Sequence, residues 1–136
     1  MNTLTKMLTM VAAAGAVTAL TVAPASAAVI DQDQVNASVS GNRLTGFVNW
    51  TSYYGGSGQV TIYNDMSDGV CATAQQRVYR GGAWSGWSDI ARVCTIPSYT
   101  AGVYVSSNGQ PVQYWQFRLH DADSDWVYDT NSPGGA

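Results

Sequence analysis

The chain has 136 residues, with six Lys or Arg, nine Asp, no Glu and one His, and a formal net charge of −3. This length is typical of one domain, and an acidic chain without a basic cluster argues against nucleic acid and anionic membranes as partners. The glycine-rich letters GGAWSG lack the lysine and the following helix of a phosphate-binding loop.

The first 27 residues predict a secretory signal peptide. Lys6 gives a positive start, residues 7–22 form an apolar run, and small residues lead up to Ala27, after which we expect cleavage. The run is too short and wrongly flanked to span a membrane, and no second run of that length follows. The expected product is a secreted single domain of residues 28–136 without a membrane span.

The composition after residue 27 predicts an all-β fold. Helix-forming residues are scarce there, whereas Val, Thr, Tyr, Trp, Gly and Ser are plentiful. We count seven to eight short strands at close spacing. This number favours a small antiparallel β-sandwich, or a partly open barrel, with one disulfide.

The first predicted hairpin comes from alternation of apolar and polar residues. Val35, Ala37 and Val39 share one face, and after a turn at Gly41-Asn42 the apolar positions of residues 44–50 continue on that face. The letters of residues 53–58 predict a loop, because four of the six are Gly or Ser. A strand follows with Val60 and Ile62 on one side, and residues 64–69 predict Asx-type turns.

The second predicted hairpin spans residues 71–94 and holds the only two cysteines. With Gly82-Ala83 as its loop, the paired positions are Arg80–Ser85, Val78–Trp87, Ala74–Ala91, Ala72–Val93 and Cys71–Cys94. Because opposed strand positions are close enough for a disulfide, Cys71 and Cys94 are expected to be bonded outside the cell. This register makes the cysteines a hydrogen-bonded pair, whose Cα atoms lie farther apart than those of a non-hydrogen-bonded pair, so we expect a bulge or a three-residue loop.

A third hairpin is predicted from residue 99 to residue 119 around Asn108-Gly109, a strong turn signal. Trp115, Phe117 and Leu119 share a face in it, with Gly102 opposite Trp115 to leave room for the ring. The last expected strand is residues 126–128. The tail, residues 131–136, is expected to fray.

Residues 84–88, Trp-Ser-Gly-Trp-Ser, match a WSxWS box, and there the chain resembles the membrane-proximal fibronectin type III domains of cytokine receptors. The resemblance implies arginines stacked between the tryptophans, with Arg77 and Arg80 just upstream. Since at least two predicted strands follow the box, which the family pattern does not allow, we interpret it as convergent. The register places Arg80 diagonal to Trp87, within reach of a cation–π contact. The alternative is a Trp/Arg ladder that stiffens an exposed strand.

One carboxylate cluster follows His120. We predict either a solvated loop or a structural calcium site there, and expect no other cofactor. An EF-hand is excluded because Trp126 stands where glycine is required and Ser132 where the bidentate glutamate is required. The candidate calcium ligands are Asp121, Asp123, Asp125 and Asp129.

Catalysis is the least favoured function. His120 is the only histidine, and no strained G-x-S-x-G turn presents a serine. One histidine with bonded cysteines makes a poor zinc site, and no pair of aspartates is singled out for glycoside hydrolysis. A hydrolase using His120 with an aspartate is therefore the third hypothesis.

The sequence feature that favours a specific function is the high content of Tyr and Trp. All thirteen Tyr and Trp lie after residue 27, and such side chains suit sugar stacking or protein contact as well as core packing. The first hypothesis is therefore a non-catalytic module that binds extracellular carbohydrate. The alternative is a protein-binding or protease-inhibitor-like module that uses the hairpin tip, residues 80–87. The candidate ligand-binding residues are Tyr53, Tyr54, Tyr79, Arg80, Trp84 and Trp87.

Overall fold

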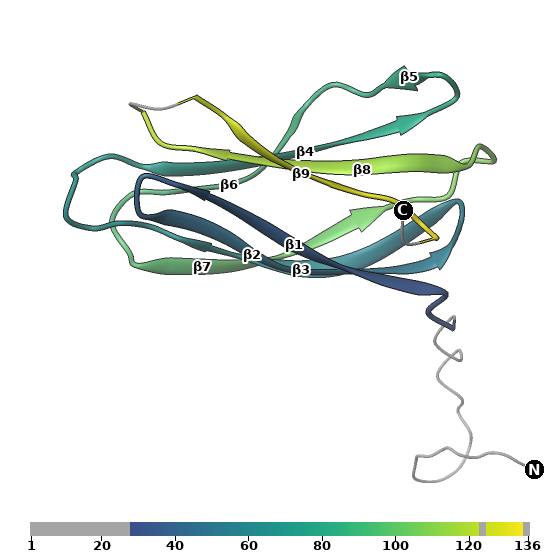
Figure 1. Ribbon diagram of the computed structural model, residues 1–136, viewed down its shortest axis with the longest axis horizontal. Helices are drawn as coiled ribbons and strands as arrows, with labels where there is room; N and C mark the ends of the chain where they lie inside the picture. The colour runs from purple at the N-terminus through teal and green to yellow at the C-terminus, as the bar shows by residue number, and fades with distance from the viewer. Residues whose placement is uncertain (1–27, 123–124, 135–136) are drawn as a thin grey trace, which may run out of the picture.

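The computed structural model describes residues 28–122 and 125–134, and within them it is an all-β sandwich without a helix (Figure 1). One sheet has four strands and the other has five. The four-stranded sheet contains β1 (Asp31–Val39), β2 (Asn42–Ser52), β3 (Gly55–Tyr63) and β7 (Ser98–Val105). The five-stranded sheet contains β4 (Ala72–Arg80), β5 (Ala83–Trp84), β6 (Ser88–Val93), β8 (Val112–His120) and β9 (Val127–Asn131).

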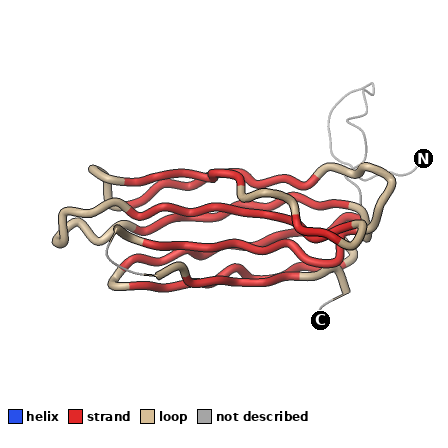
Figure 2. The backbone as a smooth tube through the Cα atoms, turned by 90° about the horizontal axis from the view of Figure 1, so that it is seen from above, coloured by secondary structure: helices blue, strands red, loops and turns tan. Residues whose placement is uncertain are grey.

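The sandwich is open at both sides and is not a barrel. Its four-stranded sheet has the order β1-β2-β3-β7, and its five-stranded sheet has the order β5-β4-β8-β9 with β6 also paired to β4. Strand β1 contacts β9 at one side, and β6 contacts β7 at the other. Seen from above, the strands run side by side along the length of the sandwich, with loops at both of its ends (Figure 2). The predicted sandwich is thereby confirmed, with nine strands instead of seven or eight.

The core lies between the two sheets and follows the predicted alternation. Trp115, Phe117 and Leu119 are fully buried on one face of β8, as their spacing indicated. The Trp115 ring meets the buried Trp50 ring edge-on, with centroids 5.7 Å apart. Apolar burial of this kind is the main stabilising contribution to such a domain.

The first hairpin is confirmed, whereas the predicted loop of residues 53–58 is mostly strand. Strands β1 and β2 pair with Val35 opposite Gly46, and only Tyr53 and Tyr54 separate β2 from β3. The glycines that suggested a loop are needed inside the sheet. A Cβ atom on Gly58 would lie 2.1 Å from the Phe47 carbonyl oxygen.

The predicted third hairpin is wrong. Strand β7 pairs with β3, and β8 pairs with β4, so the Asn108-Gly109 segment crosses from one sheet to the other. Gly102 stands opposite Gln59 instead of Trp115. Gly109 does adopt a positive φ of 87°, and that conformation serves a crossing connection as well as a hairpin turn.

The hairpin that contains both cysteines is correct near its base and wrong near its tip. Ala72 pairs with Val93 and Ala74 with Ala91, and the expected bulge follows at once, between Ala74 and Gln75. At the tip Arg80 pairs with Ala83, because the loop is Gly81-Gly82. Both glycines have positive φ, 61° and 81°, which alanine at position 83 would adopt only under strain.

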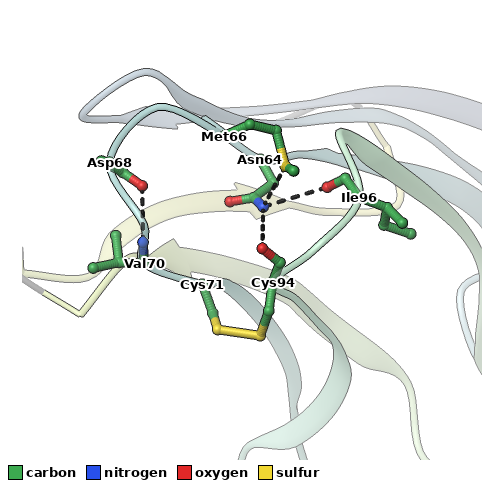
Figure 3. Close-up of a disulfide and its surroundings, with 7 residues drawn as sticks. All are labelled: Asn64, Met66, Asp68, Val70, Cys71, Cys94 and Ile96. Carbon is green, nitrogen blue, oxygen red and sulfur yellow. Dashed lines mark hydrogen bonds between the residues drawn. A yellow bond between two sulfur atoms is a disulfide. The ribbon is translucent and has the colours of Figure 1, made fainter.

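The disulfide between Cys71 and Cys94 is present, with Cα atoms 4.2 Å apart (Figure 3). Asn64 fixes the adjacent loops, since its Nδ2 donates to the carbonyl oxygens of Cys94 at 3.2 Å and Ile96 at 3.3 Å. The predicted Asx turns are present nearby, where the Val70 N–H donates to the Asp68 side chain at 3.0 Å. The disulfide therefore lies at the base of the hairpin, far from its glycine tip.

The last strand is longer than expected. Strand β9 ends at Asn131, and both Asn131 and Ser132 are buried, so the predicted fraying does not begin at residue 131. Residues 135–136 and the predicted signal peptide, residues 1–27, lie outside the described residues. The described part of the chain holds no helix that is long and apolar enough to cross a membrane.

Candidate functional site

The outer face of the five-stranded sheet carries stacked tryptophan and arginine side chains. Since Trp115 and Phe117 face the core, the alternating positions Gln116 and Arg118 face outward on β8, and Arg77 does so on the neighbouring strand β4. The guanidinium carbon of Arg77 lies 4.0 Å from the Trp84 ring centre and 4.3 Å from that of Trp87.

Arg118 continues the stack. Its guanidinium carbon lies 3.9 Å from the Trp87 ring centre and 3.8 Å from that of Trp126. The His120 ring then stacks on Trp126 with centroids 3.8 Å apart. We call this set the Trp–Arg ladder, which consists of Trp84, Arg77, Trp87, Arg118 and Trp126.

Glutamine side chains hold both arginines in place. Arg77 Nε donates to Gln116 Oε1 at 2.9 Å, and Arg118 Nε donates to Gln75 Oε1 at 2.9 Å. Such fixed guanidinium groups stack well on aromatic rings. The alternative interpretation of the tryptophans, a Trp/Arg ladder, is therefore observed. Its two cations are Arg77 and Arg118.

Two of the predicted binding residues lie in surroundings that differ from the expectation, and their role in binding stays a prediction. Arg80 does not stack on Trp87, because the hairpin register differs at the tip. Its side chain is half-buried, and its buried Nη1 atom has no hydrogen-bond partner in the part of the chain that the structure describes. Trp87 is half-buried under two guanidinium groups. Little of its ring face is left for a sugar to stack on.

The other predicted aromatics form a second cluster, which shares Trp84 with the ladder. The rings of Tyr79 and Trp84 meet edge-on with centroids 5.1 Å apart. The Tyr114 ring is stacked with the Trp84 ring, with centroids 6.3 Å apart. Tyr114 also lines a shallow groove of about 550 Å³ at the end of the sandwich. The groove is lined by Tyr53, Tyr54, Pro111, Val112, Gln113, Tyr114, Ser132 and Pro133.

A backbone hydrogen bond positions the groove tyrosines. The Val112 N–H donates to the Tyr53 carbonyl oxygen at 2.8 Å, which ties the β2–β3 turn to the start of β8. Tyr53, Tyr54 and Tyr114 remain 58%, 40% and 43% exposed. We call Tyr53, Tyr54, Tyr79, Trp84 and Tyr114 the tyrosine surface. Tyr114 was missed in the sequence, although alternation with Trp115 indicates that it faces outward.

The structure does not gather the candidate calcium ligands that it describes. Asp121 is buried and accepts a hydrogen bond from Asn42 Nδ2 at 3.2 Å. Asp125 is exposed, and Asp129 lies in β9 opposite Phe117. Asp123 lies outside the described residues, within which no three His, Cys, Asp or Glu side chains form a metal-binding group. Calcium at this loop stays a prediction.

Asp129 faces the open side of the sandwich between β9 and β1. Burial raises the pKa of its carboxyl group, and the nearby charge of Asp33 adds to the rise. The Asn131 side chain, which donates at 2.9 Å, and the Asn36 backbone N–H act in the opposite direction. Asp33 itself accepts a hydrogen bond from Trp50 Nε1 at 3.0 Å.

His120, which the hydrolase hypothesis requires, is held by its contact with Trp126. Among residues 28–122 and 125–134, no group forms a hydrogen bond with the buried Nδ1 atom of His120. A general base is normally oriented by a hydrogen bond to this nitrogen. The geometry therefore gives the hydrolase hypothesis no support.

Comparison of the chain with protein-family models, with curated proteins and with solved structures gave no significant match.

Proposed function

We propose that the chain is a secreted, non-catalytic domain that binds carbohydrate at the tyrosine surface. The observation that carries this proposal is the groove at the end of the sandwich, where three exposed tyrosines converge from two separate segments. Tyrosine has a flat apolar ring for the face of a sugar and a hydroxyl for its hydroxyl groups.

The shape and polarity of the groove support the same ligand. The groove is open and shallow, which suits a chain of sugar units that passes over the surface. Gln113, which lines it, adds an amide that can both donate and accept hydrogen bonds. Trp84 and Tyr79 extend the aromatic area beyond the groove through Tyr114.

A pull-down with insoluble polysaccharides, followed by a glycan array, tests this function. We expect the wild type to be retained and Tyr53→Ala/Tyr54→Ala to remain in the supernatant with its fold intact. Tyr63→Ala is the matched control, because Tyr63 is 37% exposed but lies on β3 in the other sheet. A wild type that stays in solution with every polysaccharide and binds no arrayed glycan would reject the proposal.

The second candidate is a protein-binding module at the hairpin tip, and one observation favours it. The tip is held rigid: the Ser85 N–H donates to the Val78 carbonyl oxygen at 2.8 Å, and the Val78 N–H donates to Ser85 Oγ at 3.0 Å. A loop that is ordered before binding loses less entropy on binding.

Gly86→Arg separates the two candidates. Gly86 is exposed in the tip, and a Cβ atom there would meet nothing within 4 Å. An arginine at this position should weaken inhibition of a target protease or binding of a protein partner, while polysaccharide binding at the groove continues. If the wild type and Gly86→Arg inhibited every protease of a panel equally, the hairpin tip would not be the binding site for a protein partner.

A further inference from the structure

Strand β7 forms one edge of the four-stranded sheet, with β3 on its inner side. Its eight residues pair with β3 from Ser98 to Val105 without a register shift. Among the described residues, no backbone–backbone hydrogen bond outside the strand ladders involves β7. Strand β6 of the other sheet contacts β7 but does not pair with it, so the outer row of N–H and C=O groups on β7 has no strand hydrogen-bonded to it among the described residues. Figure 1 shows where β7 lies in the four-stranded sheet.

The other edge strands are protected from such pairing. Strand β1 carries Asp31 and Asp33, β9 carries Asp129, and β6 carries Asp89 and Arg92. Strand β5 has only two residues. Charges and short length are the usual means by which edge strands avoid one another.

Strand β7 has neither protection. No charged residue occurs from residue 95 to residue 117, and β7 contains no proline. Its composition favours pairing, since Val, Tyr and Thr account for most of it. Tyr104 is 70% exposed on its outward face. The bare edge is thus confined to one strand of the molecule.

We propose that β7 pairs antiparallel with β7 of a second copy of this chain, so that two four-stranded sheets join edge to edge. A second copy fits because a two-fold pair brings the same uncharged strand against itself, and no charge meets a like charge. By contrast, β1, β6 and β9 each carry at least one acidic residue, and a charged side chain on an edge strand disfavours pairing with another strand.

Symmetry also selects the register. Under a two-fold axis, paired residues face the same side of the sheet, so the centre of the pair must be a single residue. Centring on Gly102 places Tyr104 of each copy opposite Thr100 of the other, a favourable aromatic–β-branched pair. Centring on Ala101 would place Tyr104 opposite Ser98. We therefore infer Gly102 as the centre of the dimer.

Sedimentation of the whole secreted domain tests the pairing, and Gly102 is the position to change. A Cβ atom there would meet nothing within 4 Å, and the φ angle of Gly102 is not among the positive ones. Pairing of one strand from each copy buries little surface area, so we expect a reversible dimer whose fraction rises with protein concentration. Gly102→Lys should abolish it because the two charges would face each other, whereas the matched variant Gly102→Thr should keep it.

Crosslinking tests the register. Gly102→Cys should give a disulfide-linked dimer on a non-reducing gel, because directly opposed positions are within bonding range. Gln34→Cys, exposed on β1, should not. A wild type that is monomeric at every soluble concentration, or equal dimerisation of the Lys and Thr variants, would overturn the proposal. Crosslinking of the two Cys variants to the same extent would overturn the register.

Discussion

The guanidinium carbon of Arg118 lies 3.9 Å from the centre of the Trp87 ring, and the two residues come from segments that are far apart in the sequence. Trp87 belongs to the connection between β5 and β6, whereas Arg118 lies on β8. Trp126, just before β9, stacks against the same guanidinium group. The Arg118 side chain on β8 therefore links the β5–β6 connection with the segment before β9.

Arg118→Ala is expected to destabilise the fold by about 1–2 kcal/mol, since it removes two cation–π contacts. It also removes the hydrogen bond to Gln75. Urea unfolding followed by tryptophan fluorescence measures the loss. Arg92→Ala is the control, because Arg92 is exposed on β6 and should change stability by no more than about 0.5 kcal/mol. Equal effects of the two substitutions would mean that the ladder does not stabilise the sheet.

Removal of the disulfide is a separate prediction. Cys71→Ala/Cys94→Ala should lower the free energy of unfolding by about 3 kcal/mol, because the bond closes a loop of this length in the unfolded chain. Urea unfolding with and without a thiol reductant provides the measurement. The reductant should destabilise the wild type and leave the double variant unchanged; a wild type insensitive to full reduction would contradict the prediction.

Gly58→Ala should destabilise the sandwich by roughly 1–3 kcal/mol because overpacking displaces the backbone. The new Cβ atom would lie 2.1 Å from the Phe47 carbonyl oxygen, which is fixed in β2. Gly86→Ala is the matched control, since a Cβ atom at Gly86 has open space. Thermal unfolding of both variants by circular dichroism compares them. Similar melting temperatures would show that β2 and β3 can separate at no cost.

Sequence alone predicted which side chains are buried because alternation is a local property of each strand. The core positions Trp115, Phe117 and Leu119 were therefore found, together with the first hairpin and the disulfide. Partner choice is not local. Strands β7 and β8 follow each other across an Asn-Gly pair but belong to different sheets, and nothing in either strand encodes that difference.

The same limit applies to the candidate site. Tyr53 and Tyr54 were among the candidate ligand-binding residues, and both are exposed. Their neighbour Tyr114 lies on β8 and reaches them only because the β2–β3 turn is bonded to Val112. Likewise, Arg118 was not associated with the tryptophans, since its place beside Gln75 depends on the pairing of β4 with β8.

Asp129 and Asp65 should show opposite pH dependences. Burial raises the pKa of Asp129, so the folded state binds its proton more tightly than the unfolded chain does, and this group favours folding increasingly as the pH falls. The Ser67 hydroxyl and then the Ser67 N–H lower the pKa of Asp65, so its contribution is present at neutral pH and is lost in acid.

Asp129→Asn should therefore stabilise the protein at neutral pH, because a neutral amide avoids the cost of a buried charge, and the gain should shrink in acid. Asp65→Asn should destabilise it at neutral pH, and that loss should shrink as the pH falls below the ordinary Asp pKa of 3.8 and disappear once Asp65 is protonated in the folded state as well. Urea midpoints for both variants and the wild type, taken from neutral pH down to below this value, measure the two trends. If the urea midpoints of the two variants changed with pH in the same way, burial between β1 and β9 would not determine the pKa of Asp129.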